Sequence, residues 1–434
     1  MRVEPSSGYE SADSLVTTIS GFIRFYREAI VRYHEKHIDG PLLEKLSGAI
    51  TTAIEVDRNT IFAFGNGGSH AITRHLERSL KLELSGSRLG IRIDHGIDFH
   101  AAQAVVCADG YDQIFVDTLM NSQANADDLV ILITGSGNSS NLLRAAEYCR
   151  ERGIRTISMA GFDGGEITRK EITDIAIVID IHDQQMSEDI IQQTLHIVAR
   201  CTRDRVTGCK DSATMHKRAY VAALARGLDL LSGSFLNALS DSVTEAFLDE
   251  RHVFVLAPEG DGLSISAEHI AHNLNWDAVF EIADPPRRNI SSTPTSCDFS
   301  GIGNDRLMPG VVSCQQLDKA RPDDVLVLNA RDSAAETVRN TLRHAKETGM
   351  IVYLLAGHDS GQGAPDCPHV ILGTDSSSIV ADLVQMTGHI LGRLVHMKLK
   401  QRLQQSQDIG PDSLSYLVEC DLAQRRLLHA VHGV

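Results

Sequence analysis

The sequence predicts an α/β fold that contains two parallel β-sheets covered by helices. Three observations lead to this prediction: the chain is long, strand and helix patterns alternate along it, and the alternation restarts near residue 210. Its 434 residues are 42% hydrophobic and 23% charged, which is enough apolar material for two or three domain cores. Strands that are separated by helices form parallel sheets with helices on both faces.

The first half contains five short apolar segments that read as strands. Residues 1–12 are polar, and helical periodicity then extends from residue 12 to about residue 55, with Pro41 opening a second helix. Helices are also expected over 114–120, from about 141 to 152, and from 187 onward. The expected strands cover residues 60–64, 89–93, 129–133, 155–159 and 175–180.

The second half repeats this pattern at a nearly constant distance. Residues 211–250 are helical, and four strands are expected at 252–257, 324–329, 350–355 and 369–372. These strands begin 192 to 195 residues after those at 60, 129, 155 and 175, and His269 and His389 follow His75 and His196 by 194 and 193 residues. The spacing predicts an internal duplication of a whole domain. We therefore expect domains at 12–208 and 211–405 and a helical tail at 406–434.

Composition excludes several classes of partner. The net charge of −16 argues against binding to nucleic acid or to anionic membranes. No apolar run approaches the ~18 residues of a membrane span, and the first residues lack a signal-peptide pattern. The eight cysteines are scattered without a CxxC pair, as is typical of reduced thiols in a cytoplasmic protein and not of a thiolate zinc site.

The segment 129–144 combines a buried strand, a small polar loop and a helix start. The loop contains Thr134, Ser136, Ser139, Gly135 and Gly137. Unpaired backbone N–H groups and the helix dipole favour an anion at a helix start, and glycines allow close approach. The loop therefore suits a phosphate monoester, although no GK[ST] sequence follows as in a Walker loop. The alternative is an ordinary strand-to-helix turn with serine and asparagine caps.

Several motifs together resemble the sugar isomerase (SIS) domains, and among them the phosphoheptose isomerases. The resemblance covers roughly residues 15–205, and it is only an outline in the second half, where it involves residues 267–274, 303–305 and 388–391. It implies two flavodoxin-like SIS domains. The motifs that carry it are GNGGSH at 65–70, DGYD at 109–112, GSGNS at 135–139, GFDGG at 161–165, and Glu188-Asp189 with His196.

The resemblance implies an aldose–ketose isomerase that moves a proton between C1 and C2 of a phosphorylated sugar through an enediol. Such chemistry needs a base, an acid and a grip on the phosphate. The expected substrate is sedoheptulose 7-phosphate, which would give a heptose 7-phosphate. The alternatives are an octulose 8-phosphate and a non-catalytic module that binds a phosphosugar. The resemblance assigns substrate or phosphate contacts to Asn66, Gly67, Ser69, Asp109, Thr134, Ser136 and Ser139.

The resemblance also assigns the catalytic side chains, namely His75, Glu188 and His196, with His196 as the proton donor or acceptor. Some members of the family hold a zinc ion, and two histidines with one carboxylate suffice for such a site. The sequence departs from the family at Ser79, where a glutamate is expected one helical turn after His75, and Glu188 stands where a glutamine is common. The alternative is that His75 and His196 are core histidines of a helix pair.

The second half has lost the phosphate loop. Residues 329–336 lack glycine there and carry Asp332 and Glu336, which would repel a phosphate, whereas His269, His272, His389 and Asp305 remain. Isomerases of this family build their sites between the subunits of a tetramer. The chain is therefore expected to be a fused dimer whose second half lends side chains to the first pocket. Two such chains are expected to form a homodimer that mimics the tetramer.

Overall fold

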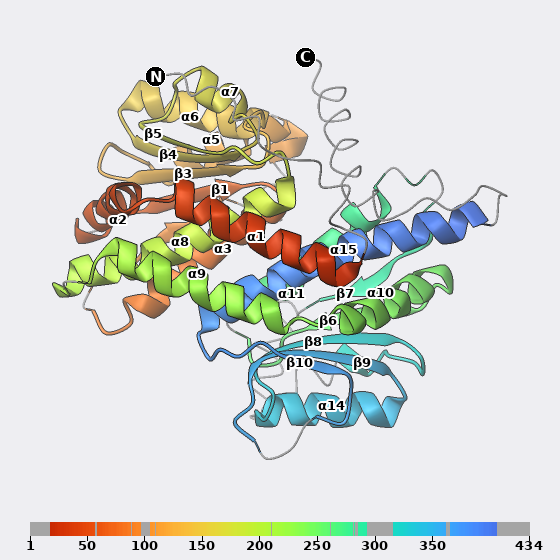
Figure 1. Cartoon of the computed structure of the whole chain (residues 1–434). Coiled ribbons are helices and arrows are strands. Elements are labelled where there is room, and N and C mark those ends of the chain that lie inside the picture. The colour runs from red at the N-terminus through yellow and green to blue at the C-terminus, as the bar shows by residue number, and fades with distance from the viewer. Residues whose placement is uncertain are drawn as a thin grey trace.

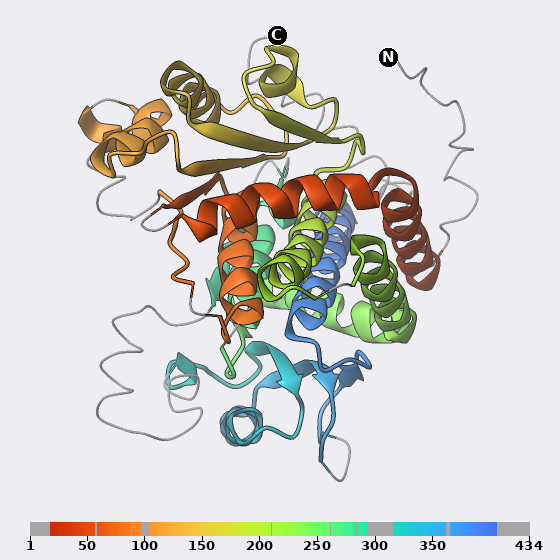
Figure 2. The same cartoon turned by 90° about the vertical axis from the view of Figure 1, so that its left-hand side faces the viewer.

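The computed structural model consists of two β-sheets on opposite sides of a layer of helices (Figures 1 and 2). Long helices from both halves of the chain cross in this central layer, so the halves share one interior. The structure describes residues 18–56, 59–87, 89–96, 105–108, 110–209, 211–260, 262–280, 282, 285–292, 316–361 and 365–405.

The first sheet is entirely parallel and has the strand order β2-β1-β3-β4-β5. All six residues of β3 are buried, as expected for a central strand covered on both faces. Ile61 of β1 lies opposite Leu129 of β3. The strands are β1 (Ile61–Gly65), β2 (Ile93–Asp94), β3 (Leu129–Thr134), β4 (Arg155–Gly161) and β5 (Ile175–Ile179).

The second sheet is also parallel and has the order β10-β9-β8-β6-β7. Read from β7, this order repeats that of the first sheet, which is consistent with the predicted duplication. It is the flavodoxin-like order, and the predicted fold class is confirmed. The strands are β6 (His252–Leu256), β7 (Asn289–Ser291), β8 (Val325–Asp332), β9 (Ile351–His358) and β10 (His369–Ile371).

The helices of the central layer come in pairs from the two halves. Thr18, Asp39, Ser212 and Ser232 cap the first helices of each half with their side chains. The first half supplies α1 (Ile19–His37), α2 (Gly40–Glu55), α3 (Gly68–Glu83) and α8 (Gln184–Thr207), and the second supplies α9 (Ala213–Leu230), α10 (Gly233–Leu248), α11 (Gly262–Asn275) and α15 (Ser377–Gln405).

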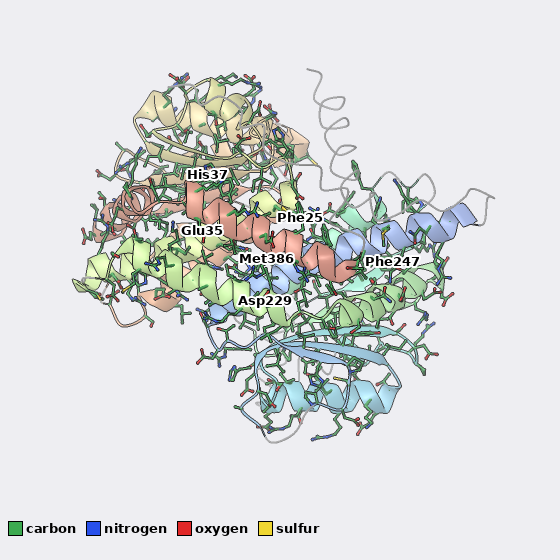
Figure 3. The ribbon with its side chains drawn as sticks, in the orientation of Figure 1. Phe25, Glu35, His37, Asp229, Phe247 and Met386 are labelled. Atoms are coloured by element: carbon green, nitrogen blue, oxygen red, sulfur yellow. The ribbon has the colours of Figure 1, made fainter. Side chains whose placement is uncertain are left out.

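A continuous hydrophobic core runs through this layer and joins both halves. It includes Tyr26, Leu195, Tyr220 and Leu391, none of which is more than 2% exposed. Figure 3 labels Met386 of α15, which is fully buried in the same layer. Two smaller cores lie on the outer faces of the sheets. The outer elements are α5 (Ile114–Asn121), α6 (Ser140–Arg152) and α7 (Gly165–Arg169) on the first sheet and α14 (Glu336–Thr348) on the second.

Two predictions about the elements need comment. The long helix expected from residue 187 begins three residues earlier, because the Asp183 side chain accepts a hydrogen bond from the Met186 N–H and caps the helix. The expected tail at 406–434 and Asp305 lie outside the described residues. Among the helices that the structure describes, none is long and apolar enough to cross a membrane.

Candidate active site

The candidate site lies at the carboxyl ends of β1 and β3, where the strand order reverses. Ligands of open parallel sheets bind at this kind of crevice. Asn66, directly after β1, and Asn141, in the first turn of α6, exchange amide hydrogen bonds of 3.1 and 2.9 Å. The Tyr111 hydroxyl also donates to Asn66 Oδ1 at 2.8 Å. These bonds hold the glycine loop at residues 65–70 beside the loop that precedes α6.

The predicted phosphate loop is folded around its own hydroxyls. Thr134 Oγ1 accepts from the Gly137 N–H at 3.0 Å, and Ser136 Oγ accepts from the Asn138 N–H at 3.2 Å. Gly137 has a φ of +71°, and a Cβ there would collide with the Gly164 carbonyl. Ser139 is the N-cap residue of α6 but makes no capping hydrogen bond with its side chain. The loop therefore leads a ligand to the start of α6, a helix of thirteen residues. Its role in phosphate binding stays a prediction.

Glu188 lies next to this loop and to the glycine loop at residues 65–70. A Cβ placed on Gly135 would lie 3.2 Å from the Gln184 side chain, and Gln184 Nε2 donates to Glu188 Oε1 at 3.4 Å. A Cβ on Gly68 would lie 2.7 Å from Glu188 Oε2. Gly67 is the N-cap residue of α3 and has a φ of +52°, and Ser69 is buried in the first turn of this helix. The two loops and Glu188 thus form one site, while Asp109 lies outside the described residues.

Glu188 is accompanied in this site by two histidines from the second half. His269 Nε2 of α11 and His389 Nε2 of α15 lie 3.5 and 3.8 Å from Glu188 Oε2. All three residues are at most 4% exposed. Among the described residues, two groups of at least three histidine, cysteine or acidic side chains have potential metal-ligand atoms that all lie within 4.8 Å of one another. Glu188, His269 and His389 form one of these groups. The second half therefore supplies imidazoles to the pocket of the first half.

A layer of buried polar groups orients these imidazoles. His269 Nδ1 lies 3.0 Å from Gln385 Oε1, and Gln385 Nε2 donates to Asp189 Oδ1 at 3.1 Å. His389 Nδ1 lies 3.0 Å from the same Asp189 oxygen, and Tyr26 donates its hydroxyl proton to Asp189 Oδ2 at 2.5 Å. Because the amide oxygen of Gln385 accepts from Nδ1 of His269, neutral His269 turns the lone pair of Nε2 toward Glu188.

The site shifts the pKa values of two of its groups. Burial alone raises the pKa of Glu188, but the neighbouring imidazoles of His269 and His389 lower it below its ordinary value. Burial alone lowers the pKa of His389, but Asp189 and Glu188 raise it above its ordinary value. Glu188 therefore stays ionised near neutral pH, and His389 holds a proton more readily than a free imidazole does.

The structure does not bring His75, Glu188 and His196 together as predicted. The rings of His75 and His196 lie 5.5 Å apart, and His196 Nδ1 contacts Asp382 at 2.9 Å and the Tyr220 hydroxyl at 3.0 Å. His75 Nε2 lies 3.3 Å from Ser266 Oγ. Glu188 and His196 face the same side of α8, but eight residues of helix separate them by about 12 Å along its axis. The side chains whose ligand atoms lie close enough together to hold a metal ion are therefore those of Glu188, His269 and His389, not those of the predicted set.

Because the group contains His269 and not His75, the residue expected one helical turn further along is also a different one from Ser79. Ser79 follows His75 by one helical turn and is buried away from Glu188. The residue one turn after His269 is Asn273, which is 2% exposed and whose amide nitrogen makes no hydrogen bond within the described part of the chain. Asn273 is therefore the residue of this site that corresponds, 194 positions later, to Ser79.

The site also contains residues to which the sequence analysis gave no individual role. Asp189 and Gln385 orient the imidazoles, and His272 lies at the mouth, where a Cβ on Gly67 would be 3.3 Å from its Nε2. A signal for two of these was present, because the pattern D-x-x-Q-x-x-x-H occurs at 189–196 and again at 382–389.

Comparisons with known proteins identify the family of the chain. A model of the SIS domain family matches residues 25–161. The phosphoheptose isomerase of Helicobacter pylori (strain P12) is 31% identical over 163 residues, which are 37% of this chain and 83% of that protein. The phosphoheptose isomerase of Aliarcobacter butzleri (strain RM4018) is 35% identical over 143 residues, which are 32% of this chain and 74% of that protein. The chain belongs to the SIS domain family.

A solved structure extends the likeness in fold to both halves. The tagatose-6-phosphate ketose/aldose isomerase of Escherichia coli superposes with a TM-score of 0.56 and covers 91% of this chain and 96% of that chain. The two sequences are 14% identical, so this comparison concerns the fold alone. Both sheets and the helical layer between them therefore belong to a known arrangement.

Proposed function

We propose that this chain is an aldose–ketose isomerase of a phosphorylated sugar, and that its substrate is sedoheptulose 7-phosphate. The observation that carries the proposal is the group formed by Glu188, His269 and His389 beside the phosphate loop. The chain's relatives support an enzyme of the sugar-phosphate isomerase class, since both curated relatives are named phosphoheptose isomerases. The loop would hold the phosphate, and the acid–base groups would face the other end of the sugar.

The side chains fit the two proton transfers that the reaction needs. Glu188 stays ionised and takes the proton from the carbon next to the carbonyl group. His389, whose pKa is raised beside Asp189, moves a proton between the two oxygens of the enediol. Asn273 offers an amide where the family has a carboxylate, so Glu188 supplies the negative charge of the pocket.

As an alternative to this acid–base arrangement, we propose that the same side chains hold a zinc ion as a cofactor, in which case His389 would bind the metal and would not move protons. Nε2 of both His269 and His389 is buried and makes no hydrogen bond within the described residues. Their distances of 3.5 and 3.8 Å to Glu188 Oε2 are close to the about 3.3–3.5 Å that separate neighbouring ligands of tetrahedral zinc. A bound zinc ion would polarise the carbonyl oxygen of the sugar. Gln385 and Asp189 would keep both imidazoles in the orientation that leaves Nε2 free to bind it.

An isomerase assay on purified protein tests the proposal. Wild-type protein should convert sedoheptulose 7-phosphate into an aldose phosphate, and Glu188→Gln should lose about 10²–10⁴-fold in kcat. Glu151→Gln, at an exposed position of α6, is the matched control and should retain full turnover. Tight binding of the sugar phosphate by wild type without any turnover would favour the non-catalytic module, and faster turnover of an octulose 8-phosphate would favour the longer substrate.

A further inference from the structure

The carboxyl group of Asp277 is a further polar feature at the edge of the candidate active site. Asp277 begins η3 (Asp277–Val279), the short 3-10 helix that follows α11, and α11 carries His269. Asp277 Oδ2 accepts a hydrogen bond of 3.0 Å from Gln185 Nε2 in the first turn of α8. This bond brings a carboxyl group of the second half to the helix that carries Glu188.

The direction of Asp277 relative to Glu188 follows from the geometry of α8. Glu188 projects between Gln184 and Gln185, about 40° from the first and about 60° from the second around the helix axis. Gln184 is the side chain next to Gly135 of the predicted phosphate loop. Because Gln185 is bonded to Asp277, the loop and Asp277 lie on opposite sides of Glu188. A sugar chain that extends from the loop across Glu188 would therefore reach Asp277.

One oxygen of the Asp277 carboxyl group is fixed by neighbouring side chains and the other is open. Arg393 Nε donates to Gln185 Oε1 at 2.6 Å, so the amide nitrogen of Gln185 faces Asp277. Asp277 Oδ1 makes no hydrogen bond within the described part of the chain. Burial raises the pKa of this carboxyl group, and the nearby charge of Glu188 acts in the same direction. Oδ1 is therefore a partly desolvated acceptor that remains available to a ligand.

The corresponding carboxyl group of the first half is neutralised by two arginines. Glu83 stands 194 residues before Asp277. One of its oxygens lies 2.6 Å from Arg203 and the other lies 3.6 Å from Arg200. No arginine or lysine among the described residues pairs with Asp277, because Arg393, 193 residues after Arg200, donates to two side chains of α8 instead. The open oxygen is therefore a difference between the two halves and not a general feature of the fold.

We propose that Asp277 is a substrate-binding residue that accepts a hydrogen bond from a hydroxyl group of the sugar, at the end of the sugar chain away from the phosphate. Hydroxyl groups are the donors that such a chain offers, and a hydrogen bond to an ionised acceptor is roughly twice as strong as a neutral one. The second half thus contributes to recognition of the sugar as well as to the acid–base group. This inference rests on the proposed function, because it assigns a further residue to the same site.

Calorimetric titration of the full chain with two phosphates tests the proposal. Heptitol 7-phosphate, obtained by reduction of sedoheptulose 7-phosphate, keeps the hydroxyl groups of the sugar but has no carbonyl group and cannot be isomerised. Glycerol 3-phosphate carries the same phosphate group on a short chain. Asp277→Asn keeps an acceptor for Gln185 and removes the other oxygen, so it should weaken binding of the heptitol phosphate by about 10- to 100-fold and leave that of the glycerol phosphate unchanged. Equal weakening of both, or an unchanged affinity for the heptitol phosphate, would overturn the proposal.

Controls separate this role from folding and from the isomerase activity. Asp229→Asn removes an exposed carboxylate of α9 and should bind both phosphates like wild type. The melting temperature of Asp277→Asn without ligand should match that of wild type. Loss of heptitol phosphate affinity in Asp277→Asn, in a chain whose wild type has no turnover, would reject the isomerase and retain this residue. Turnover of sedoheptulose 7-phosphate with the same KM in wild type and Asp277→Asn would retain the isomerase and reject this residue.

Discussion

His389 and His196 occupy corresponding positions in the two halves but have different neighbours, so they form a matched pair of variants. His389 lies beside Glu188, whereas His196 contacts Asp382 and Tyr220. His389→Gln should lower kcat by about 10²–10⁴-fold, and His196→Gln should change it less than tenfold. Steady-state kinetics of both variants, with melting temperatures as a check on folding, measure this difference. The reverse order of effects would return the catalytic role to His196, as the sequence alone suggested.

A second residue-scale prediction concerns pH. His34 is fully buried beside Gln193, and burial lowers its pKa to about 4. Because this value lies below the unfolded pKa of about 6.5, the neutral form is favoured by folding, and its stabilisation is complete above pH 6.5 and is lost as the pH falls toward 4. At pH 5 the unfolded chain binds a proton at this histidine and the folded chain does not. This difference should lower the free energy of unfolding by about 2 kcal/mol relative to pH 7.5.

Urea unfolding at pH 7.5 and at pH 5 measures this loss. His34→Gln retains a hydrogen-bonding side chain but cannot titrate, so the loss between the two pH values should shrink by about 2 kcal/mol in the variant. His70 and His396 have pKa values lowered in the same direction, also to about 4, and continue to titrate in both proteins. Equal losses in wild type and variant would mean that folding does not lower the pKa of His34.

At the scale of elements, the loop from Thr134 to Ser139 depends on its hydroxyls and on the start of α6. Ser136→Ala should weaken binding of the sugar phosphate by about 1–3 kcal/mol, the value of a hydrogen bond to a charged group. Trp276 is the sole tryptophan of the chain, and its ring lies 6.5 Å from that of His272 at the mouth of the site, so its fluorescence can follow the titration. Thr52→Ala, at an exposed position of α2, is the control. An unchanged affinity in Ser136→Ala would exclude this hydroxyl from the phosphate site.

The elements themselves could be predicted well because their signals are local. The strands expected at 129–133 and 155–159 begin where β3 and β4 begin, since apolar runs and turn residues determine both. β7 was missed because it has three residues and lies in an irregular stretch.

The site could be predicted only in part. Its loops follow from local sequence, but which histidine meets Glu188 depends on how two halves pack, and helical periodicity says nothing about displacement along the axis.

At the scale of the whole molecule, the two halves exchange buried charges across their interface. Asp189 of the first half contacts His389 of the second, and Asp382 of the second contacts His196 of the first. Tyr26 and Tyr220 donate to these two aspartates in the same manner. The halves therefore depend on each other, because separating them would leave these two carboxylates without their imidazole partners. This reciprocity explains how one chain can contain a site that single-domain relatives are expected to build between subunits.

The last prediction concerns the assembly of such chains. A fused pair satisfies one of the interfaces of a four-domain assembly and leaves the other self-complementary surface to a second chain, which twofold symmetry covers most simply. The mass in solution should therefore be about 95 kDa, twice the 47.3 kDa of one chain. Light scattering after gel filtration at about 10 µM measures this mass. Because Glu188, His269 and His389 all come from one chain, dilution that dissociates the dimer should leave the isomerase site assembled. A mass near 47 kDa at that concentration would contradict the predicted homodimer without affecting the proposed activity.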